Sequence, residues 1–451
     1  MSRETLGSRL GFILISAGCA IGIGNVWKFP YMVGENGGGA FVLIYLLFLI
    51  ILGVPVMTME FAMGRAAAKS PVRIYQKLVP DKEIWHWHGL VMMAGNYLLM
   101  MFYTTVSGWM LLYFFKTATG SFAGLEPKGV ADAFTGMLAD PVLQVVPMTL
   151  IVVTGFFIVS RGLQSGLERI TKVMMLLLFV IMVILAVNSV FLPGAEEGIR
   201  FYLTPDFAKM QEHGIVNVAV GAMNQAFFTL SLGIGALAIF GSYISKDRSL
   251  FGEALNVAAL DTFVAFVSGL IVIPACFAYG VEPGAGPGLI FITLPNIFNH
   301  MPGGEVWGSL FFIFMTFAAF STVLAVFENI IACTMDIFYC SRKKAAYVNM
   351  ALIFLLSLPC ALGFNVLSDL SFLPEGKTFL DLEDFLVSNI LLPGGALLYV
   401  LFCMHRYGWG AENFYHEANM GKGAKLPGWA RPYFTFILPL IVGSILVMGL
   451  L

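Results

Sequence analysis

Eleven apolar runs, each long enough to cross a lipid bilayer as a helix, constrain this chain more than any other feature. Backbone groups in hydrocarbon must hydrogen bond within their own segment, so such runs become helices. Hydrophobic residues make up 59% of the chain and charged residues 12%. We therefore predict an all-α integral membrane protein with about eleven transmembrane helices. The predicted spans cover residues 10–33, 39–63, 86–115, 141–160, 170–192, 215–241, 254–280, 304–338, 346–364, 382–405 and 432–451.

The distribution of positive charge predicts which ends of the spans face the cytoplasm. If consecutive spans alternate in direction, the N-terminus shares one side with the loops 64–85, 161–169, 242–253, 339–345 and 406–431. That side carries 19 of the 25 lysine and arginine residues, an excess typical of cytoplasmic loops. We predict a multi-pass protein of the cell membrane with a cytoplasmic N-terminus and an extracellular C-terminus. The first run has no small-residue cleavage site, so we expect a retained span and not a signal peptide.

Glycine interrupts two of these runs at matching depths. The first run contains residues 18–25 (GCAIGIGN), and the sixth contains residues 230–235 (LSLGIG). Such breaks free backbone N–H and C=O groups, which are tolerated in a membrane only where they face protein or a polar cavity. The alternative is a pair of small-residue notches for close helix packing. We favour discontinuous first and sixth helices around a polar site.

The positions of the two breaks also predict internal symmetry. Spans one to five and six to ten correspond only if one set is inverted, because five is an odd number. Inverted repeats of broken helices are typical of secondary transporters. We predict a first five-helix repeat at residues 1–192, an inverted second repeat at 193–405, and a cytoplasmic loop with a peripheral eleventh helix at 406–451.

Around these breaks the chain resembles the neurotransmitter:sodium symporter family, in its bacterial amino-acid transporter branch with the leucine-transporter fold. The resemblance implies a secondary active transporter that moves a small substrate together with sodium. The family usually has twelve spans, one more than we expect here. The matching stretches are residues 9–11, 20–30 (AIGIGNVWKFP), 35–41, 60–65, 161–162, 166–169, 227–235 (FFTLSLGIG) and 291–295.

The resemblance implies two sodium sites built from oxygen donors, which a hard cation needs once it loses its hydration shell. The first would use the substrate carboxylate together with Ala20, Asn25, Thr229 and Asp261. The second would lie between the first and eighth spans, at the carbonyls of Gly18, Ile21 and Ala318 and the hydroxyls of Ser321 and Thr322. Hydroxyls in membrane helices also bond back to their own carbonyls, which leaves a purely structural role open for the last two residues.

Asp261 departs from the family pattern, which usually has asparagine at this position. Chloride-dependent members also carry a serine where this chain has Ala265. Two sodium ions in a low-dielectric site need compensating negative charge, and Asp261 can supply it in place of a bound anion. We expect chloride-independent transport, although the family's other chloride-site residues, Tyr45, Gln225 and Thr229, are present. The alternative for Asp261 is a structural pairing with a neighbouring helix.

Gly22 indicates the substrate class, because the biogenic-amine members of the family carry an aspartate there. Without that side chain there is room for a substrate carboxylate, which the N–H groups at the ends of broken helices favour. A charged substrate side chain would be buried unpaired, so we expect a neutral, hydrophobic or aromatic L-amino acid. The resemblance implies a substrate site formed by Ala20, Gly22, Ile23, Gly24, Leu99, Tyr103, Phe228, Thr229, Ser231, Ile234, Thr322 and Val326.

The family pattern also assigns gates on both sides of the site. Lys28 stands where the family has arginine, so a bidentate clamp on a carboxylate is not available at the outer gate. Glu60, in the second span, is expected either to cap freed backbone groups of the broken sixth helix or to be a structural buried carboxyl. The expected gating residues are Lys28 and Asp384 on the outside and Arg3, Asp336 and Tyr243 on the inside.

Other chemistry is absent from the sequence. It contains no motif for ATP hydrolysis, for zinc or haem binding or for nucleophilic catalysis, so we expect a transporter and not an enzyme. We expect the lipid bilayer, a small neutral amino acid and two sodium ions as partners, and no nucleic acid. Two other classes stay open, an amino-acid sensor with a transporter fold and a sodium-leak channel. The leak channel would carry current without accumulating substrate.

Overall fold

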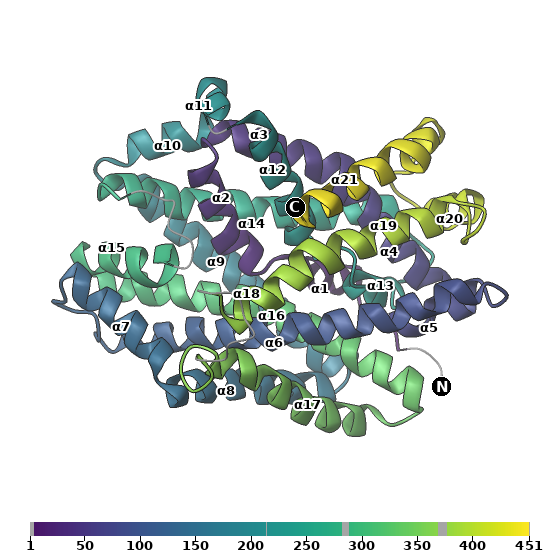
Figure 1. The fold of residues 1–451 in the computed structure, drawn as a ribbon, viewed down its shortest axis with the longest axis horizontal. Coiled ribbons are helices and arrows are strands. Elements are labelled where there is room, and N and C mark those ends of the chain that lie inside the picture. Colours follow the sequence, from purple (N-terminus) through teal and green to yellow (C-terminus); the bar gives the residue numbers. More distant parts are fainter. Residues whose placement is uncertain (1–3, 213, 282–287, 369–376, 451) are drawn as a thin grey trace.

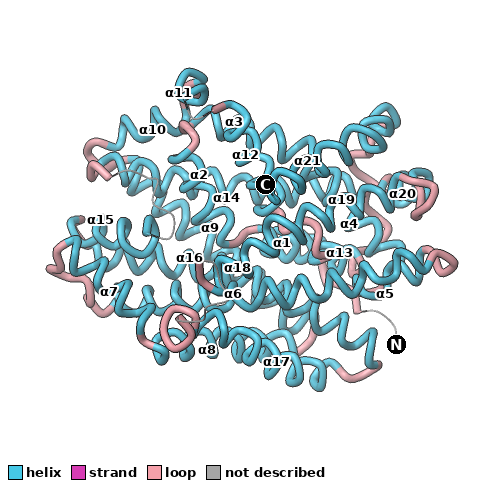
Figure 2. Tube along the Cα trace, viewed as in Figure 1, coloured by secondary structure: helices cyan, strands magenta, loops and turns pink. Residues whose placement is uncertain are grey.

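The computed structural model describes residues 4–212, 214–281, 288–368 and 377–450. Within these residues the chain consists of helices joined by loops, with no β-strand (Figure 2). By length and composition, nine helical segments of the described chain can each cross a membrane, and the bent pair Arg9–Ala20 and Gly24–Glu35 makes ten. Two shorter helices, α12 and α13, occupy the predicted sixth span. The prediction of an all-α membrane protein with about eleven spans is confirmed.

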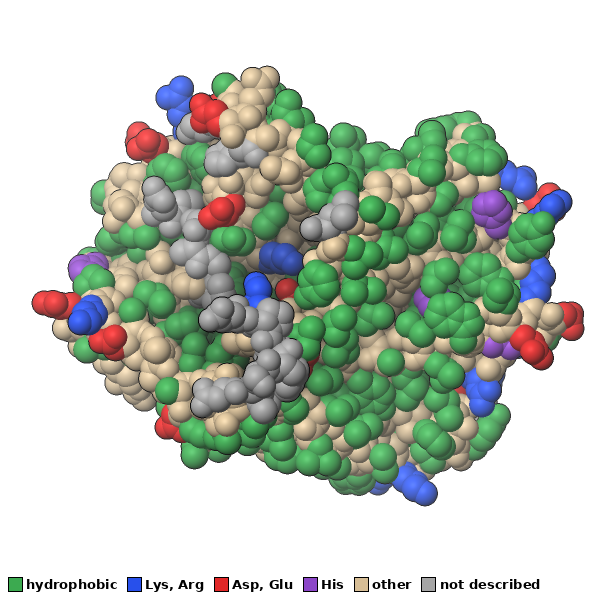
Figure 3. Space-filling model, in the orientation of Figure 1, with side chains coloured by type: hydrophobic (Ala, Val, Ile, Leu, Met, Phe, Trp, Pro, Cys, Tyr) green, Lys and Arg blue, Asp and Glu red, His purple; other side chains and the backbone are tan. Residues whose placement is uncertain are grey.

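Many of the long helices run along the longest axis of the molecule (Figure 1). Charged side chains gather mainly towards the two ends of this axis, and hydrophobic side chains cover most of the band between them (Figure 3). This pattern is what a protein shows when its middle lies in hydrocarbon and its ends lie in water. The long axis is therefore close to the membrane normal.

The membrane-spanning helices follow the apolar runs, and several contain a π-helical turn. Such turns lie at the start of a span or within it, at Gly24–Lys28, Leu49–Gly53, Leu163–Glu168, Leu386–Leu391 and Tyr433–Ile437. The helices of the spans are α1 Arg9–Ala20, α2 Phe29–Glu35, α3 Gly39–Phe48, α4 Val54–Ala67, α6 His86–Ala118, α8 Pro141–Ser160, α9 Arg169–Val190, α12 Ile215–Thr229, α13 Ala236–Gly241, α14 Leu250–Ala278, α16 Gly304–Phe338, α17 Arg342–Leu362, α18 Phe379–Phe385, α19 Leu392–Met404 and α21 Leu438–Leu450.

Shorter helices lie in segments that the sequence analysis left as loops. They are α5 Pro71–Leu78, α7 Pro127–Ala139, α10 Ala195–Leu203, α11 Phe207–Glu212, α15 Leu294–His300 and α20 Ala411–Ala418. Each is too short to span a bilayer, so a search for long apolar runs passes over it. Two further turns of 3₁₀-helix lie at Glu83–Trp85 and Gly428–Ala430.

The core is centred on α16, which packs along α6 and against α1, α8 and α9. In the apolar window of α16, 83% of residues are buried inside the protein, compared with 22% in the last span, Gly428–Leu450. The last span therefore lies at the periphery, and α1 with its break lies beside the most enclosed helix of the molecule.

Candidate functional site

The two predicted breaks are present, and they lie against each other. The first helix stops at Ala20, and helical structure resumes at Gly24. The second break covers residues 230–235, between α12 and α13. Gln225 Nε2 donates to the Gly24 carbonyl at 2.8 Å, and Ser231 Oγ donates to the Cys19 carbonyl at 3.3 Å. Side chains of the sixth span therefore bond to carbonyls on both sides of the first break, and the Gly24 carbonyl also accepts the Phe29 N–H.

Three residues predicted for the first sodium site form one hydrogen-bonded cluster. Asn25, Thr229 and Asp261 are each 0% exposed. Asn25 Nδ2 donates to Asp261 Oδ1 at 2.8 Å, and Thr229 Oγ1 donates to Asp261 Oδ2 at 3.2 Å. Asn25 Oδ1 in turn accepts the Gly22 N–H at 3.1 Å. The cluster offers amide, hydroxyl and carboxylate oxygens, the donor types that suit a hard cation.

The residues predicted for the second sodium site also come together, between α1 and α16. Ser321 Oγ lies 2.9 Å from the Gly18 carbonyl oxygen, 3.3 Å from that of Ile21 and 2.9 Å from that of Ala318. Thr322 Oγ1 lies 3.3 Å from the Gly18 oxygen and 3.2 Å from the Ile21 oxygen. Of the three Ser321 contacts, only the one to Ala318 is a bond back to its own helix. The other two reach carbonyls of the first span. Five oxygens on two helices thus converge, which is a fit for a hard cation.

A small enclosed cavity lies between the breaks. Its volume is ≈ 20 Å³, room for little more than one water molecule, so an amino acid enters only after the cavity widens. A Cβ built on Gly22 would overlap the Tyr103 hydroxyl, so this wall tolerates only glycine in the closed form. The lining contains no charged side chain. It consists of Ala20, Gly22, Gly24, Leu99, Tyr103, Phe228, Ser231, Thr322 and Leu392.

Four residues expected at the substrate do not line this cavity. Ile23 donates its N–H to the Tyr103 hydroxyl at 2.9 Å, and Thr229 belongs to the Asp261 cluster. Ile234 and Val326 are buried behind the lining. Conversely, the sequence analysis missed Leu392, which directly follows the π-helical turn at Leu386–Leu391. That turn shifts which side of the tenth span faces the cavity, and the apolar sequence carries no signal for it.

Polar side chains of neighbouring spans hold the second break in place. Gly233, with φ +104°, donates its N–H to Glu60 Oε1 at 2.7 Å. The carbonyl of Ile234 accepts from Asn96 Nδ2 at 2.8 Å, and Asn329 Nδ2 donates to Asn96 Oδ1 at 3.1 Å. Of the two roles left open for Glu60, its position favours the capping of freed backbone groups. The sequence analysis did not assign Asn96 or Asn329.

The predicted outer gate pair is arranged differently from a simple ion pair. In the described chain, Lys28 does not bond to Asp384; its Nζ lies 4.0 Å from the ring centroid of Phe228, and Asp384 accepts from Ser388 Oγ at 2.7 Å. On the inner side, Asp336 Oδ2 accepts the Ser70 N–H at 2.8 Å.

Tyr243 donates to Glu328 Oε1 at 2.7 Å, and Arg342 Nη1 lies 2.6 Å from Glu328 Oε2. Arg3 lies outside the described residues. The inner end of the site therefore carries an ion pair that the sequence analysis did not assign.

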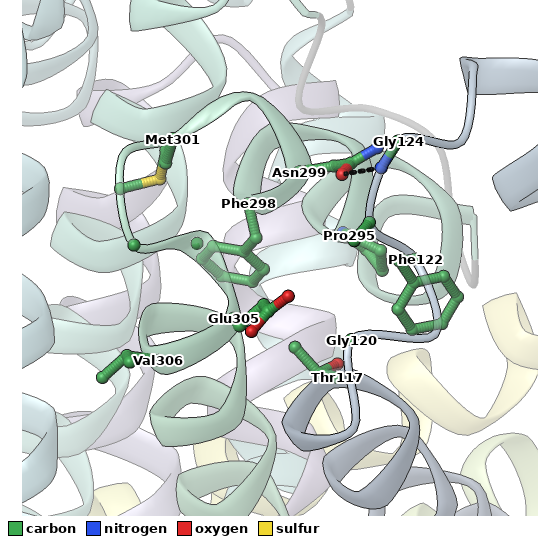
Figure 4. Close-up of a pocket in the computed structure, with 13 residues that line it drawn as sticks. Thr117, Gly120, Phe122, Gly124, Pro295, Phe298, Asn299, Met301, Glu305 and Val306 are labelled. Atoms are coloured by element: carbon green, nitrogen blue, oxygen red, sulfur yellow. Dashed lines mark hydrogen bonds between the residues drawn. The ribbon is translucent and has the colours of Figure 1, made fainter.

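A larger cavity, ≈ 340 Å³, lies away from the breaks, where the end of α6 and the following loop meet α15 and the start of α16 (Figure 4). Phe122 and Phe298 contribute rings to it, and Asn299 Oδ1 accepts the Gly124 N–H at 3.2 Å across it. None of the residues predicted for substrate, sodium or gating lines this cavity. The volume of a cavity alone therefore does not identify the candidate substrate site.

Comparison with known proteins gives a consistent result. A model of the sodium:neurotransmitter symporter family matches residues 3–126 and 136–451. An uncharacterised sodium-dependent transporter of Bacillus subtilis, YhdH, is 38% identical over 395 residues, which cover 88% of this chain and 86% of the relative. A second uncharacterised sodium-dependent transporter, from Haemophilus influenzae, is 31% identical across 99% of this chain and 98% of its own length.

One solved structure is similar over nearly the whole chain. MhsT, in complex with L-phenylalanine, aligns with a TM-score of 0.87 and 38% sequence identity. The alignment covers 99% of this chain and 100% of MhsT.

Proposed function

The chain belongs to the sodium:neurotransmitter symporter family, and from this premise we propose that it imports a neutral L-amino acid together with sodium. This membership confirms three predictions, namely the family resemblance, a sodium-dependent transport function and a multi-pass membrane protein. The members of this family are transporters and not enzymes. The observation that carries the proposal is the convergence of two oxygen clusters and one uncharged cavity on the two breaks.

The proposed substrate side chain is hydrophobic or aromatic. The cavity wall consists of aliphatic, aromatic and hydroxyl groups, so an acidic or basic side chain would lose its hydration without gaining a partner. Gly22 leaves space for a substrate carboxylate beside the Tyr103 hydroxyl once the cavity widens. The similarity to MhsT, which binds L-phenylalanine in its solved structure, supports an aromatic substrate among the candidates.

Two sodium ions would drive the transport. Each ion gains ~2.3 kcal/mol from a membrane potential of ~100 mV and ~1.4 kcal/mol from a tenfold gradient. Two ions thus supply ~7 kcal/mol, enough for a ~10⁵-fold accumulation if coupling is tight. In the proposed mechanism, the substrate carboxylate completes the shell of Ala20, Asn25, Thr229 and Asp261. The second ion joins α1 to α16, so it holds together the two helices that must separate when the inner side opens.

Alternating access requires the two gates to open in turn. We assign the outer gate to the region of Lys28 and Asp384 and the inner gate to Arg3, Asp336 and Tyr243. The Glu328 carboxylate, bonded to Tyr243 and Arg342, adds a buried contact on the inner side.

Counterflow in proteoliposomes tests the coupling between ion and substrate. Radiolabelled neutral amino acids, L-phenylalanine included, should accumulate with external sodium and not with potassium. Asn25→Ala should weaken sodium and substrate binding together, because Asn25 orients Asp261 and also accepts the Gly22 N–H. The matched control is Asn36→Ala, because in the described chain that side chain bonds only to the Met32 carbonyl on its own helix.

The outcomes separate the candidate functions. Sodium-driven accumulation supports a symporter, current without accumulation supports a leak channel, and binding without movement supports a sensor. Substrate binding that stays independent of sodium in wild type and Asn25→Ala would contradict the mechanism.

Chloride independence is a second testable part of the proposal. Asp261 is fully buried and is hydrogen bonded to Asn25 and Thr229, so its ionised carboxylate would place one negative charge beside a bound sodium ion. Uptake should persist when chloride is replaced by gluconate. Asp261→Asn keeps the shape but removes the charge, and we expect it to weaken sodium binding at least ~10-fold. Wild-type uptake that stops in gluconate would rule out this role of Asp261.

A further inference from the structure

Three acidic residues lie within one and a half turns of α18, and only two of them accept N–H or O–H hydrogen bonds in the described chain. Asp381 forms a capping box with Thr378, whose N–H lies 2.8 Å from Asp381 Oδ2. Asp384 accepts from Ser388. Glu383 is 3% exposed, and in the described chain no N–H or O–H group donates to its carboxylate oxygens; the weak S–H donor of Cys360 lies within reach. Buried carboxylates are normally paired or hydrogen bonded, so Glu383 needs a separate explanation.

Among the described residues, the surroundings of Glu383 provide no positive charge. α18 packs against α6 and α17. The Cys360 thiol of α17 lies beside the Glu383 carboxyl, and the Thr105 hydroxyl of α6 lies beside Cys360. Asp381, on the same helix as Glu383, adds only further negative charge near Cys360. No lysine, arginine or histidine in the described residues forms an ion pair with Glu383.

A carboxylate in this seam between α6, α17 and α18 would be buried, unpaired and close to another acid. The cost of such a charge exceeds the cost of taking up a proton. We propose that Glu383 is a proton-binding site, separate from both sodium sites, that is loaded when the seam is closed and discharged when the seam opens to water. The link to transport rests on the proposed function, because it assumes that the tenth span moves during the cycle.

The position of Glu383 connects this proton to the substrate cavity. Glu383 and Leu392 belong to one bent span, Phe379–Met404, and Leu392 lines the cavity. Nine residues of helix separate them, or ~13 Å along the axis. Closure around the substrate would therefore also close the seam and take up a proton. Because only the closed form holds this proton, the closed form is most stable relative to the open form at low pH. As pH rises, the ratio of closed to open form falls by up to a factor of ~10 per pH unit.

Proton uptake measured with the full chain tests the proposal. The purified protein in weakly buffered lipid nanodiscs, with a pH indicator, receives L-phenylalanine and sodium at pH 7. Wild type should take up about one proton more than Glu383→Gln. With rising pH, the substrate affinity of wild type should fall more steeply than that of Glu383→Gln. Glu412→Gln, which replaces an acid with a side chain that is 89% exposed, is the control and should behave as wild type. Equal proton uptake in wild type and Glu383→Gln would overturn the assignment.

Infrared spectroscopy of the protein with and without sodium and L-phenylalanine separates this proposal from the proposed function. The closed protein should show a protonated carboxyl band at pH 8 that Glu383→Gln removes, whether or not an amino acid is transported. Glu383→Leu provides a second neutral variant of similar size, and both neutral variants should match or exceed the thermal stability of wild type. An unchanged carboxyl band in Glu383→Gln, or a loss of stability in both variants, would show a charged structural glutamate instead.

Discussion

At the scale of single residues, Gly22 sets the shape of the closed site. A Cβ at this position would overlap the Tyr103 hydroxyl and lie 2.6 Å from Thr322 Oγ1, on two long helices that pack against each other. Overpacking of this kind costs ~1–3 kcal/mol. Gly22→Ala should therefore weaken substrate binding about tenfold or more, measured by scintillation proximity with sodium present.

The control for this prediction is Gly136→Ala in α7, because a Cβ at Gly136 meets no atom within 4 Å. It should leave the substrate affinity unchanged. Normal affinity in Gly22→Ala would mean that the substrate-bound site is wider at this wall than the closed form indicates.

Single residues also show how far the sequence could predict the site. Asn25, Asp261, Ser321 and Thr322 lie together as the family resemblance implied, because their spacing along helices fixes their depth in the membrane. The sequence did not predict Leu392, because a local π-helical turn decides which side of the helix this residue lies on. The run around that turn is uniformly apolar.

At the scale of helices, the break between α12 and α13 depends on groups that other spans supply. Asn96 donates to both the Ile234 and the Met92 carbonyls, and only the first bond crosses to the break. Asn96→Ala leaves the Ile234 carbonyl buried without this donor, at a cost of ~1–3 kcal/mol. We expect substrate affinity to fall about tenfold in a binding assay, together with thermal stability.

Asn349→Ala is the matched control, because Asn349 is equally buried but bonds to Thr334 and Ala345, outside the site. This variant should lose stability and keep its affinity. Equal affinities in the two variants would show that Asn96 only supports the general packing.

The sequence predicted long helices well and short ones poorly. A run of about twenty apolar residues forms a helix in hydrocarbon, because a helix satisfies all backbone groups within the segment. The centres of the predicted spans therefore matched the structure. The fifth span begins at Leu163, seven residues before the predicted 170, because polar Gln164 and Ser165 hide a helical start after Gly162. Helices such as α10 and α20 depend on tertiary packing at the membrane surface, which hydropathy does not describe.

At the scale of the whole molecule, the segment around α20 ties distant parts of the inner side together. Arg65, at the end of α4, is 4% exposed, and its Nε lies 2.6 Å from Glu417 Oε1 of α20. The same guanidinium donates to the Arg248 carbonyl at 2.7 Å, in the loop that follows α13. The Ser249 N–H donates to the Lys422 carbonyl, and the Lys422 N–H donates to the Asp247 carbonyl, which extends this contact. The inner half of the broken sixth span is thereby fixed to α4, so we expect these two helices to move as one body.

Glu417→Gln tests this connection. Removing one member of a buried ion pair leaves a buried charge uncompensated and costs ~3–5 kcal/mol. Glu412 supplies the control, because its pair with Arg431 spans 3.9 Å with side chains 89% and 51% exposed, and such pairs contribute ~0–1 kcal/mol. In thermal inactivation assays, Glu417→Gln should be much less stable than Glu412→Gln, and Arg65→Met with Glu417→Met should recover most of the loss. Equal stability of Glu417→Gln and Glu412→Gln would contradict a structural connection through α20 and leave α13 free to move apart from α4.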